Sequence, residues 1–282
     1  MVNLTYLDLH DAQFCGHIPH QLRNLSSLLY LNLEENNGLY IDNLHWMFHL
    51  SSMQHLDISH TNHHREVDWL QIVSPLSSLL ELILNNCQLD SLTSSVGFVN
   101  STSLRVLDLS ENLFNQEIPN WFSNCSTSLL EYLDLRDNSL SRKIPDTLGQ
   151  LKHLTDLNLS DNSLSGPTPS SLGNLSQMQA LLLSVNKLNG TVPKSLGLLS
   201  NLFAVSISHT FFTGSLDEAH FSKLGKLKEL EISYTPLFFN VNSNWVPPFQ
   251  LEYVSMIACK IGPNKLYIFT LSMLKSIIIV EM

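Results

Sequence analysis

One short pattern recurs along almost the whole chain and limits what the chain can fold into. The frame L-x-x-L-x-L, with other apolar residues at some of its positions, begins at twelve places that lie 23 to 26 residues apart. Self-similarity with a period of this length predicts a stack of small structural units rather than a globule around one unrepeated core. The frame begins at Leu4, Leu28, Met53, Leu79, Leu104, Leu130, Leu154, Met178, Leu202, Leu227, Leu251 and Leu274.

The clearest copy, residues 104–112, reads LRVLDLSEN and shows how each unit begins. Leu107 and Leu109 alternate with outward-facing residues, which predicts a short strand that is buried on one face. One unit cannot bury its apolar face alone, so neighbouring units are expected to stack and to share a continuous core.

An asparagine ends the frame in five units. Its side-chain amide can bond backbone groups of adjacent units that a curved stack would otherwise leave unpaired. We therefore expect a ladder of asparagines after the strands. They stand at the ninth frame position, at Asn36, Asn112, Asn138, Asn162 and Asn186.

The second half of the unit reads L-x-G-x-I-P where it is complete, as in residues 14–19, 164–169 and 188–193. The glycine supplies a backbone position hostile to a Cβ atom, and the proline ends a short extended piece. Segments such as 171–175 (SLGNL) then predict a short helical turn.

These features predict an α/β repeat fold, a leucine-rich-repeat solenoid of about eleven to twelve repeats. We expect a right-handed arc with a parallel β-sheet on its concave face and short helical or 3-10 turns on its convex face. Residues 1–263 form the solenoid, and residues 264–282 are a degenerate last repeat or a non-native tail, because they fit the frame weakly.

The 24-residue frame with its I-P segment resembles the plant-specific repeats of receptor kinases and receptor-like proteins. Two divergent blocks, residues 68–89 (from DWL to CQL) and 218–251 (from EAHFS to NWVPPFQL), resemble receptor-like proteins of the ethylene-inducing-xylanase-receptor type. The resemblance implies an extracellular recognition scaffold at the plasma membrane in plant defence or development. It implies a protein or peptide ligand and signalling through partner receptor kinases that act as co-receptors or adaptors.

Such family members also carry a signal peptide, cysteine-paired caps and a transmembrane helix. The start of this chain has no basic or apolar leader segment, and the apolar stretch 267–280 is shorter than the ~20 residues that a spanning helix needs. We therefore expect a chain that is truncated at both ends and that meets the membrane only through a missing C-terminal segment. The alternatives are a soluble apoplastic inhibitor of cell-wall-degrading enzymes and a non-functional receptor fragment.

Charge and motifs argue against several other functions. The chain has 15 Lys and Arg against 25 Asp and Glu, without a basic cluster, which argues against binding to nucleic acid. It lacks the nucleophile-elbow, dinucleotide-binding and phosphate-loop motifs, so we expect neither catalysis nor a cofactor.

The cysteines and histidines give no strong sign of a disulfide or a metal site. Cys87 and Cys259 both occupy the ninth frame position, seven repeats apart, which is beyond the ~7 Å that a disulfide spans. We expect them to be small buried residues in place of asparagine, and Cys15 and Cys125 also lie too far apart to pair.

A group of histidines could hold zinc or sense pH, but a polar loop is the favoured interpretation. They are His45, His49, His55, His60, His63 and His64.

The ligand-binding candidates are tyrosines and charged residues on the expected concave face. An exposed tyrosine provides contact area at low entropic cost, and the acidic residues suggest a basic ligand, although aspartate is also ordinary at this frame position. The candidates are Tyr6, Tyr30, His55, Asp57, Asp108, Tyr132, Asp134, Asp156, Glu229, Glu231 and Tyr253.

Seven N-x-S/T sequons suggest a glycoprotein of the secretory pathway. Asn158 lies on an expected strand, where a glycan would block the concave face, whereas Asn24, Asn124 and Asn174 are expected elsewhere. The candidates are Asn3, Asn24, Asn100, Asn124, Asn158, Asn174 and Asn189.

Overall fold

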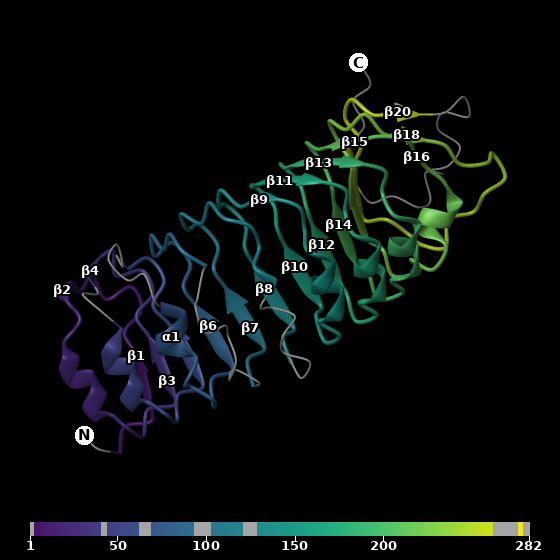
Figure 1. Cartoon of the computed structure of the whole chain (residues 1–282). Coiled ribbons are helices and arrows are strands. Elements are labelled where there is room, and N and C mark those ends of the chain that lie inside the picture. The colour runs from purple at the N-terminus through teal and green to yellow at the C-terminus, as the bar shows by residue number, and fades with distance from the viewer. Residues whose placement is uncertain are drawn as a thin grey trace. The chain divides into compact units, whose positions relative to one another are not determined.

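The computed structural model describes residues 3–40, 44–61, 69–92, 103–120, 129–261 and 276–278. The chain divides into two compact units, residues 1–139 and 140–282, and each is a stack of repeats (Figure 1). Every frame contributes one three-residue strand centred on its fourth position, so the predicted leucine-rich-repeat solenoid is confirmed. No helix in the described ranges is long and apolar enough to cross a membrane.

The first unit contains a parallel sheet whose strands follow one another in chain order. The register places equal frame positions side by side, as with Leu7, Leu31 and Leu56. Its strands are β1 (Tyr6–Asp8), β3 (Tyr30–Asn32), β5 (His55–Asp57), β6 (Glu81–Ile83), β7 (Val106–Asp108) and β8 (Tyr132–Asp134). The remaining elements are the pair β2 (Cys15–His17) and β4 (Gly38–Tyr40), the 3-10 helices η1 (His20–Asn24) and η2 (His45–His49), and α1 (Trp69–Val73).

The second unit repeats this plan. Its main parallel strands are β10 (Asp156–Asn158), β12 (Ala180–Leu182), β14 (Ala204–Ser206), β17 (Glu229–Glu231), β19 (Tyr253–Ser255) and β21 (Ser276–Ile278). One smaller sheet contains β9 (Ser141–Arg142), β11 (Ser163–Gly166), β13 (Lys187–Gly190) and β15 (Phe211–Phe212). Another contains β16 (Ser215–Leu216), β18 (Phe238–Phe239) and β20 (Lys260–Ile261). The 3-10 helices are η4 (Asp146–Gln150), η5 (Ser170–Asn174), η6 (Lys194–Leu198) and η7 (Glu218–Phe221). Strand β21 comes from the segment expected to be degenerate and pairs with β19.

The asparagine ladder forms as predicted. The buried Asn186 donates through Nδ2 to Leu159 O of the preceding repeat at 2.8 Å and to Leu183 O of its own repeat at 3.1 Å. Its Oδ1 accepts the Leu164 N–H at 2.9 Å. One amide therefore satisfies backbone groups of two repeats at once and holds them in register.

The two ladder cysteines take over part of this role. Cys87 is fully buried, and its thiol donates to Ile58 O of the preceding repeat at 3.3 Å. Cys259 donates in the same way to Ile232 O at 2.8 Å. Both are free thiols, as predicted, but they serve as hydrogen-bond donors as well as small apolar residues.

Both divergent blocks bury large aromatic side chains. In the first, Trp69 is fully buried and donates through Nε1 to Ser91 O at 2.9 Å. In the second, the Phe221 ring lies 5.7 Å from the rings of Trp245 and Phe249. The second block therefore replaces the standard second half of the repeat with aromatic packing, and the first anchors its buried tryptophan by a hydrogen bond.

Glycine is required where successive 3-10 helices stack. A Cβ atom on Gly173 in η5 would lie 2.5 Å from Ser195 O in η6, and one on Gly149 in η4 would lie 2.4 Å from Ser171 O. The clashing atoms belong to the backbone, so the next repeat would have to move.

We expect Gly173→Ala to lower the free energy of unfolding by about 1–3 kcal/mol, because the added methyl group overpacks a backbone contact. Gly225→Ala is the matched control, since its Cβ atom would lie an ordinary 3.6 Å from Pro248 O. This control should change stability by no more than about 0.5 kcal/mol. Urea unfolding followed by circular dichroism measures both, and equal effects would contradict the stacking argument.

We also expect Cys87 to resist alkylation in the folded chain. Burial raises the pKa of its thiol to about 12, so almost no thiolate is present at neutral pH. Iodoacetamide labelling followed by mass spectrometry should modify the exposed Cys15 and should reach Cys87 only after denaturant is added. Rapid labelling of Cys87 without denaturant would show that the ladder opens.

Candidate functional site

Each strand consists of frame positions three to five. The apolar residue at position four faces the core, positions three and five face the other side of the sheet, and position seven follows just beyond the strand. We call this other side the open face, and we number positions from the first leucine of the frame. Position eight follows at the edge of the open face and has a left-handed backbone in every repeat described, with φ between 47° and 60°. All predicted ligand-binding candidates occupy positions three or five.

Three candidates form a stack of rings across neighbouring strands of the first unit. The ring centroids of Tyr6 and Tyr30 lie 4.3 Å apart with 12° between the planes. Those of Tyr30 and His55 lie 4.2 Å apart with 5° between the planes. His55 Nδ1 contacts Glu81 Oε2 at 2.6 Å, which fixes the end of the stack. The parallel register thus converts three residues that are 24 and 25 positions apart in sequence into one aromatic column.

The aspartates at position five end their strands. Asp57 Oδ1 accepts the N–H of Ser59, and Asp108 Oδ1 accepts that of Ser110, each at 2.9 Å. This local turn explains why Asp or Asn recurs there. Asp57 is only 5% exposed and Asp134 only 1%, so both are poor candidates for direct contact with a ligand.

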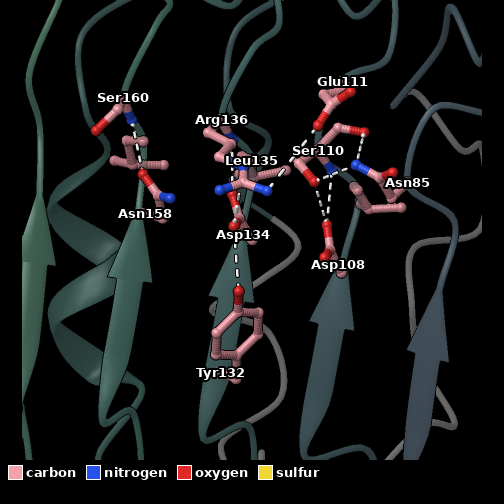
Figure 2. Close-up of polar contacts among 12 residues, drawn as sticks. Asn85, Asp108, Ser110, Glu111, Tyr132, Asp134, Leu135, Arg136, Asn158 and Ser160 are labelled. Atoms are coloured by element: carbon pink, nitrogen blue, oxygen red, sulfur yellow. Dashed lines mark hydrogen bonds and ion pairs between the residues drawn. The ribbon is translucent and has the colours of Figure 1, made fainter.

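Figure 2 shows the polar contacts around Asp134. Its carboxylate accepts the N–H of Arg136 at 2.9 Å and the hydroxyl of Tyr132 at 3.1 Å. Arg136 Nε lies 3.6 Å from Asp134 Oδ2, and the same guanidinium lies 3.9 Å from Glu111 Oε1. Burial raises the pKa of Asp134, and the Asp108 charge adds to this, while Arg136 opposes it. Burial also raises the pKa of Tyr132 strongly.

The open face of the second unit is less aromatic. Glu229 is exposed, whereas Asp156, Glu231 and Tyr253 are half-buried. The Glu231 carboxylate accepts the Ser206 hydroxyl at 2.5 Å, and the Thr155 hydroxyl donates to Asp156 at 2.6 Å. These hydrogen bonds occupy carboxylate oxygens that would otherwise be free to accept hydrogen bonds from a ligand.

Two histidines of the group that the structure describes are engaged in other contacts. Among the described residues, no group of three His, Cys, Asp or Glu side chains is arranged to hold an ion. His45 instead stacks against Phe48 at 5.7 Å, and His55 belongs to the aromatic column. His63, His64 and Cys125 lie outside the described residues.

Four of the candidate glycosylation sites have exposed side chains, which leaves room for a glycan: Asn3, Asn24, Asn174 and Asn189. Asn158 is half-buried on β10, and its Oδ1 accepts the Ser160 N–H at 3.1 Å (Figure 2). Asn100 and Asn124 lie outside the described residues.

Sequence reasoning missed the residues at positions seven and eight. His209 and Tyr234, both at position eight, stack with centroids 4.4 Å apart. Glu34 and Glu35 lie at positions seven and eight of the second repeat, where the charges of Asp57, His60 and His10 act on Glu34. Aligning the repeats beyond position five would have brought these residues into view.

Comparisons with known proteins agree with the architecture. A family model described as "Leucine-rich repeat region" matches residues 82–280, and one described as "Leucine Rich Repeat" matches residues 3–25. The first match covers more than half of the chain. The chain therefore belongs to the leucine-rich repeat family.

Within this family the chain is similar to plant receptor-like proteins. It is 40% identical over 158 residues to Receptor-like protein EIX1 of Solanum lycopersicum, which covers 55% of this chain and 15% of EIX1. It is 41% identical over 51 residues to Receptor-like protein EIX2 of the same species, and this match covers 18% of this chain and 5% of EIX2. The predicted resemblance to receptor-like proteins of the EIX type is thus confirmed, over a small part of their length.

A solved structure shows the same fold. The Arabidopsis receptor kinase HAESA, in complex with the peptide hormone IDA and the co-receptor SERK1, matches with a TM-score of 0.68 and 23% identity. The match covers 92% of this chain and 55% of that one.

The raised pKa of Asp134 predicts how Asp134→Asn will behave. At a pH below the ordinary aspartate pKa, the Asp134 carboxyl is neutral in both the folded and the unfolded chain and does not lower the stability. At a pH above that pKa the carboxyl ionises more readily in the unfolded chain, which lowers the stability of the folded state. Asparagine occupies the same position at Asn32 and Asn158 and keeps the acceptor for the turn. We expect Asp134→Asn to raise the melting temperature at pH 7 and to lose this advantage near pH 3.

Differential scanning calorimetry between pH 3 and pH 8 checks this expectation. Asp90→Asn, at an exposed position away from the sheet, serves as the control. A variant that is less stable than the parent at pH 7 would show that the Arg136 ion pair outweighs the burial of the carboxylate.

Proposed function

We propose that this chain recognises a protein or peptide through the open face of its first unit, as the extracellular part of a plant receptor-like protein. The observation that carries the proposal is the column of Tyr6, Tyr30 and His55 held by Glu81. The rings are already immobilised by their neighbours, so little further entropy is lost when a ligand contacts them.

The geometry of the column favours an extended partner over a flat ring or a sugar. Both faces of Tyr30 are covered, by Tyr6 on one side and by His55 on the other. A ligand therefore meets ring edges along the column and the outer part of Tyr6, which is 58% exposed. Ring edges and hydroxyl groups pair well with the carbonyls and side chains of a polypeptide.

The relatives support the remaining parts of the proposal. HAESA is a receptor kinase seen with a peptide hormone and a co-receptor, and EIX1 is a receptor-like protein. By analogy, this chain would act at the extracellular side of the plasma membrane, in defence or development, through a partner receptor kinase.

Site-specific photo-crosslinking tests the proposal. A benzophenone amino acid at Tyr6 should crosslink a protein or peptide from secreted fractions of plant tissue or fungal culture. The same group at Tyr40 is the matched control, because Tyr40 is 48% exposed but lies on β4. Adding Tyr30→Ala should reduce the Tyr6 crosslinks at least five-fold by removing the support of the ring.

Equal crosslinking from Tyr6 and Tyr40, or none from Tyr6, would contradict recognition by this face. Circular dichroism of each variant confirms that the fold is retained. The identity of the crosslinked species, read by mass spectrometry, then distinguishes a plant partner from a microbial one.

A further inference from the structure

An exposed aromatic side chain lies away from the open face, on the smaller sheet that contains β13 and β15 (Figure 1). Phe211 on β15 is 61% exposed, whereas the next residue, Phe212, is buried. The Phe211 ring contacts no other aromatic ring of the described residues. A single exposed apolar residue is ordinary on a protein surface, so the residue beside Phe211 decides whether the ring has a role.

That neighbouring residue is the asparagine of an N-x-S/T sequon. Asn189 on β13 and Phe211 on β15 are partners in the parallel register. Paired residues of neighbouring parallel strands point to the same side of a sheet, and the strands lie about 4.8 Å apart. Both side chains are exposed, while the preceding Leu188 and the following Phe212 are buried, so the pair projects into solvent together.

The sequon and the ring occur together at one place in this sheet. Frame position twelve of each repeat lies beside position ten of the next, and three such pairs are described. In the first two pairs a serine at position twelve lies beside Ser163 or Lys187. In the third pair the serine is replaced by Asn189 and its neighbour is Phe211.

The side-chain groups of this sequon are free for modification. No described residue forms a hydrogen bond with the Asn189 side-chain amide or with the Thr191 hydroxyl, and both side chains are exposed. Asn158, by contrast, uses its amide oxygen to accept the N–H of Ser160 in its own sequon. Strand β13 is not part of the main sheet, so a group attached to Asn189 leaves the open face clear.

We propose that Asn189 carries an N-linked glycan whose first sugar, an N-acetylglucosamine, packs on the exposed ring of Phe211. The C–H groups on one face of a pyranose are weakly positive and the face of a phenyl ring is negative, so the two attract. The contact also removes apolar surface from water. The bond to Asn189 already holds the sugar beside the ring, which raises its effective concentration there.

The modification is a glycosyl transfer from a lipid diphosphate-linked oligosaccharide, which the secretory pathway supplies. Asn189 Nδ2 forms a bond to C1 of the first sugar while the bond from C1 to the diphosphate oxygen breaks. The lipid diphosphate leaves with the electron pair, and Nδ2 gives one proton to a base of the transferase. This inference rests on the extracellular location in the proposed function, because N-glycans are added on the way to that location.

Production of the full chain in plant cells, behind a secretion leader, tests the site. Mass spectrometry of glycopeptides from whole-cell extract should find a glycan on Asn189 in most molecules of the parent and of Thr191→Ser. It should find none in Thr191→Ala, which breaks the sequon without altering Asn189. An unmodified Asn189 in the parent would overturn the proposal, and crosslinks from a benzophenone amino acid at Phe211 would then identify a protein as the occupant.

Melting temperatures of the glycosylated chains test the packing. Thr191→Ala should lower the melting temperature by about 2–4 °C in the parent and by less than about 1 °C in a Phe211→Ala background. Phe203→Ala is the matched background, since Phe203 is 43% exposed but directly precedes the main strand β14, and it should keep the full effect. An equal effect in the Phe211→Ala and Phe203→Ala backgrounds, or none in the parent, would overturn the contact with Phe211.

The crosslinking experiment at Tyr6 does not depend on a glycan, so the two proposals fail separately. An unmodified Asn189 would leave recognition through Tyr6 standing. Absent crosslinks at Tyr6 would leave a glycan on Asn189 and its contact with Phe211 standing.

Discussion

The structure depends on a side chain that bonds the backbone of two repeats at once. Asn112 shows this most fully: its Oδ1 accepts two N–H groups of the preceding repeat, and its Nδ2 donates to one carbonyl there and to two in its own repeat. Five hydrogen bonds from one buried amide fix how far each repeat advances and rotates on the last. The leucines supply most of the apolar stabilisation, but apolar contacts are not directional and would allow one repeat to slide on the next. The hydrogen bonds of the ladder do not allow this.

The register that the ladder imposes explains the candidate site. Equal frame positions lie side by side on neighbouring strands, so a column of side chains is determined by what occupies one position in successive repeats. Tyr6, Tyr30 and His55 stack because all three stand at position three.

The frame alone predicts the strands, their order, the buried leucines and the asparagine ladder, because these depend on residues within one repeat and its immediate neighbour. It does not predict the hydrogen bond from Cys259 to Ile232 O, since a thiol gives no sign in sequence of donating to the preceding repeat. The burial of Asp134 was missed for a related reason. Its exposure depends on the size of Arg136 and Tyr132 around it, and only the packed side chains show this.

The left-handed backbone at position eight restricts how such a surface can diversify. A side chain there is presented at a fixed angle, which suits recognition, but the conformation is unfavourable for most residues and most of all for β-branched ones. Aspartate, asparagine and histidine occupy it readily, and this chain uses them at Asp11, Asn86 and His209, whereas Val185 shows that an unfavourable residue can persist there. Substitutions that alter specificity along this edge are therefore drawn from a narrow chemical set. A surface that evolves under this constraint acquires charge and polarity there more easily than aliphatic contact.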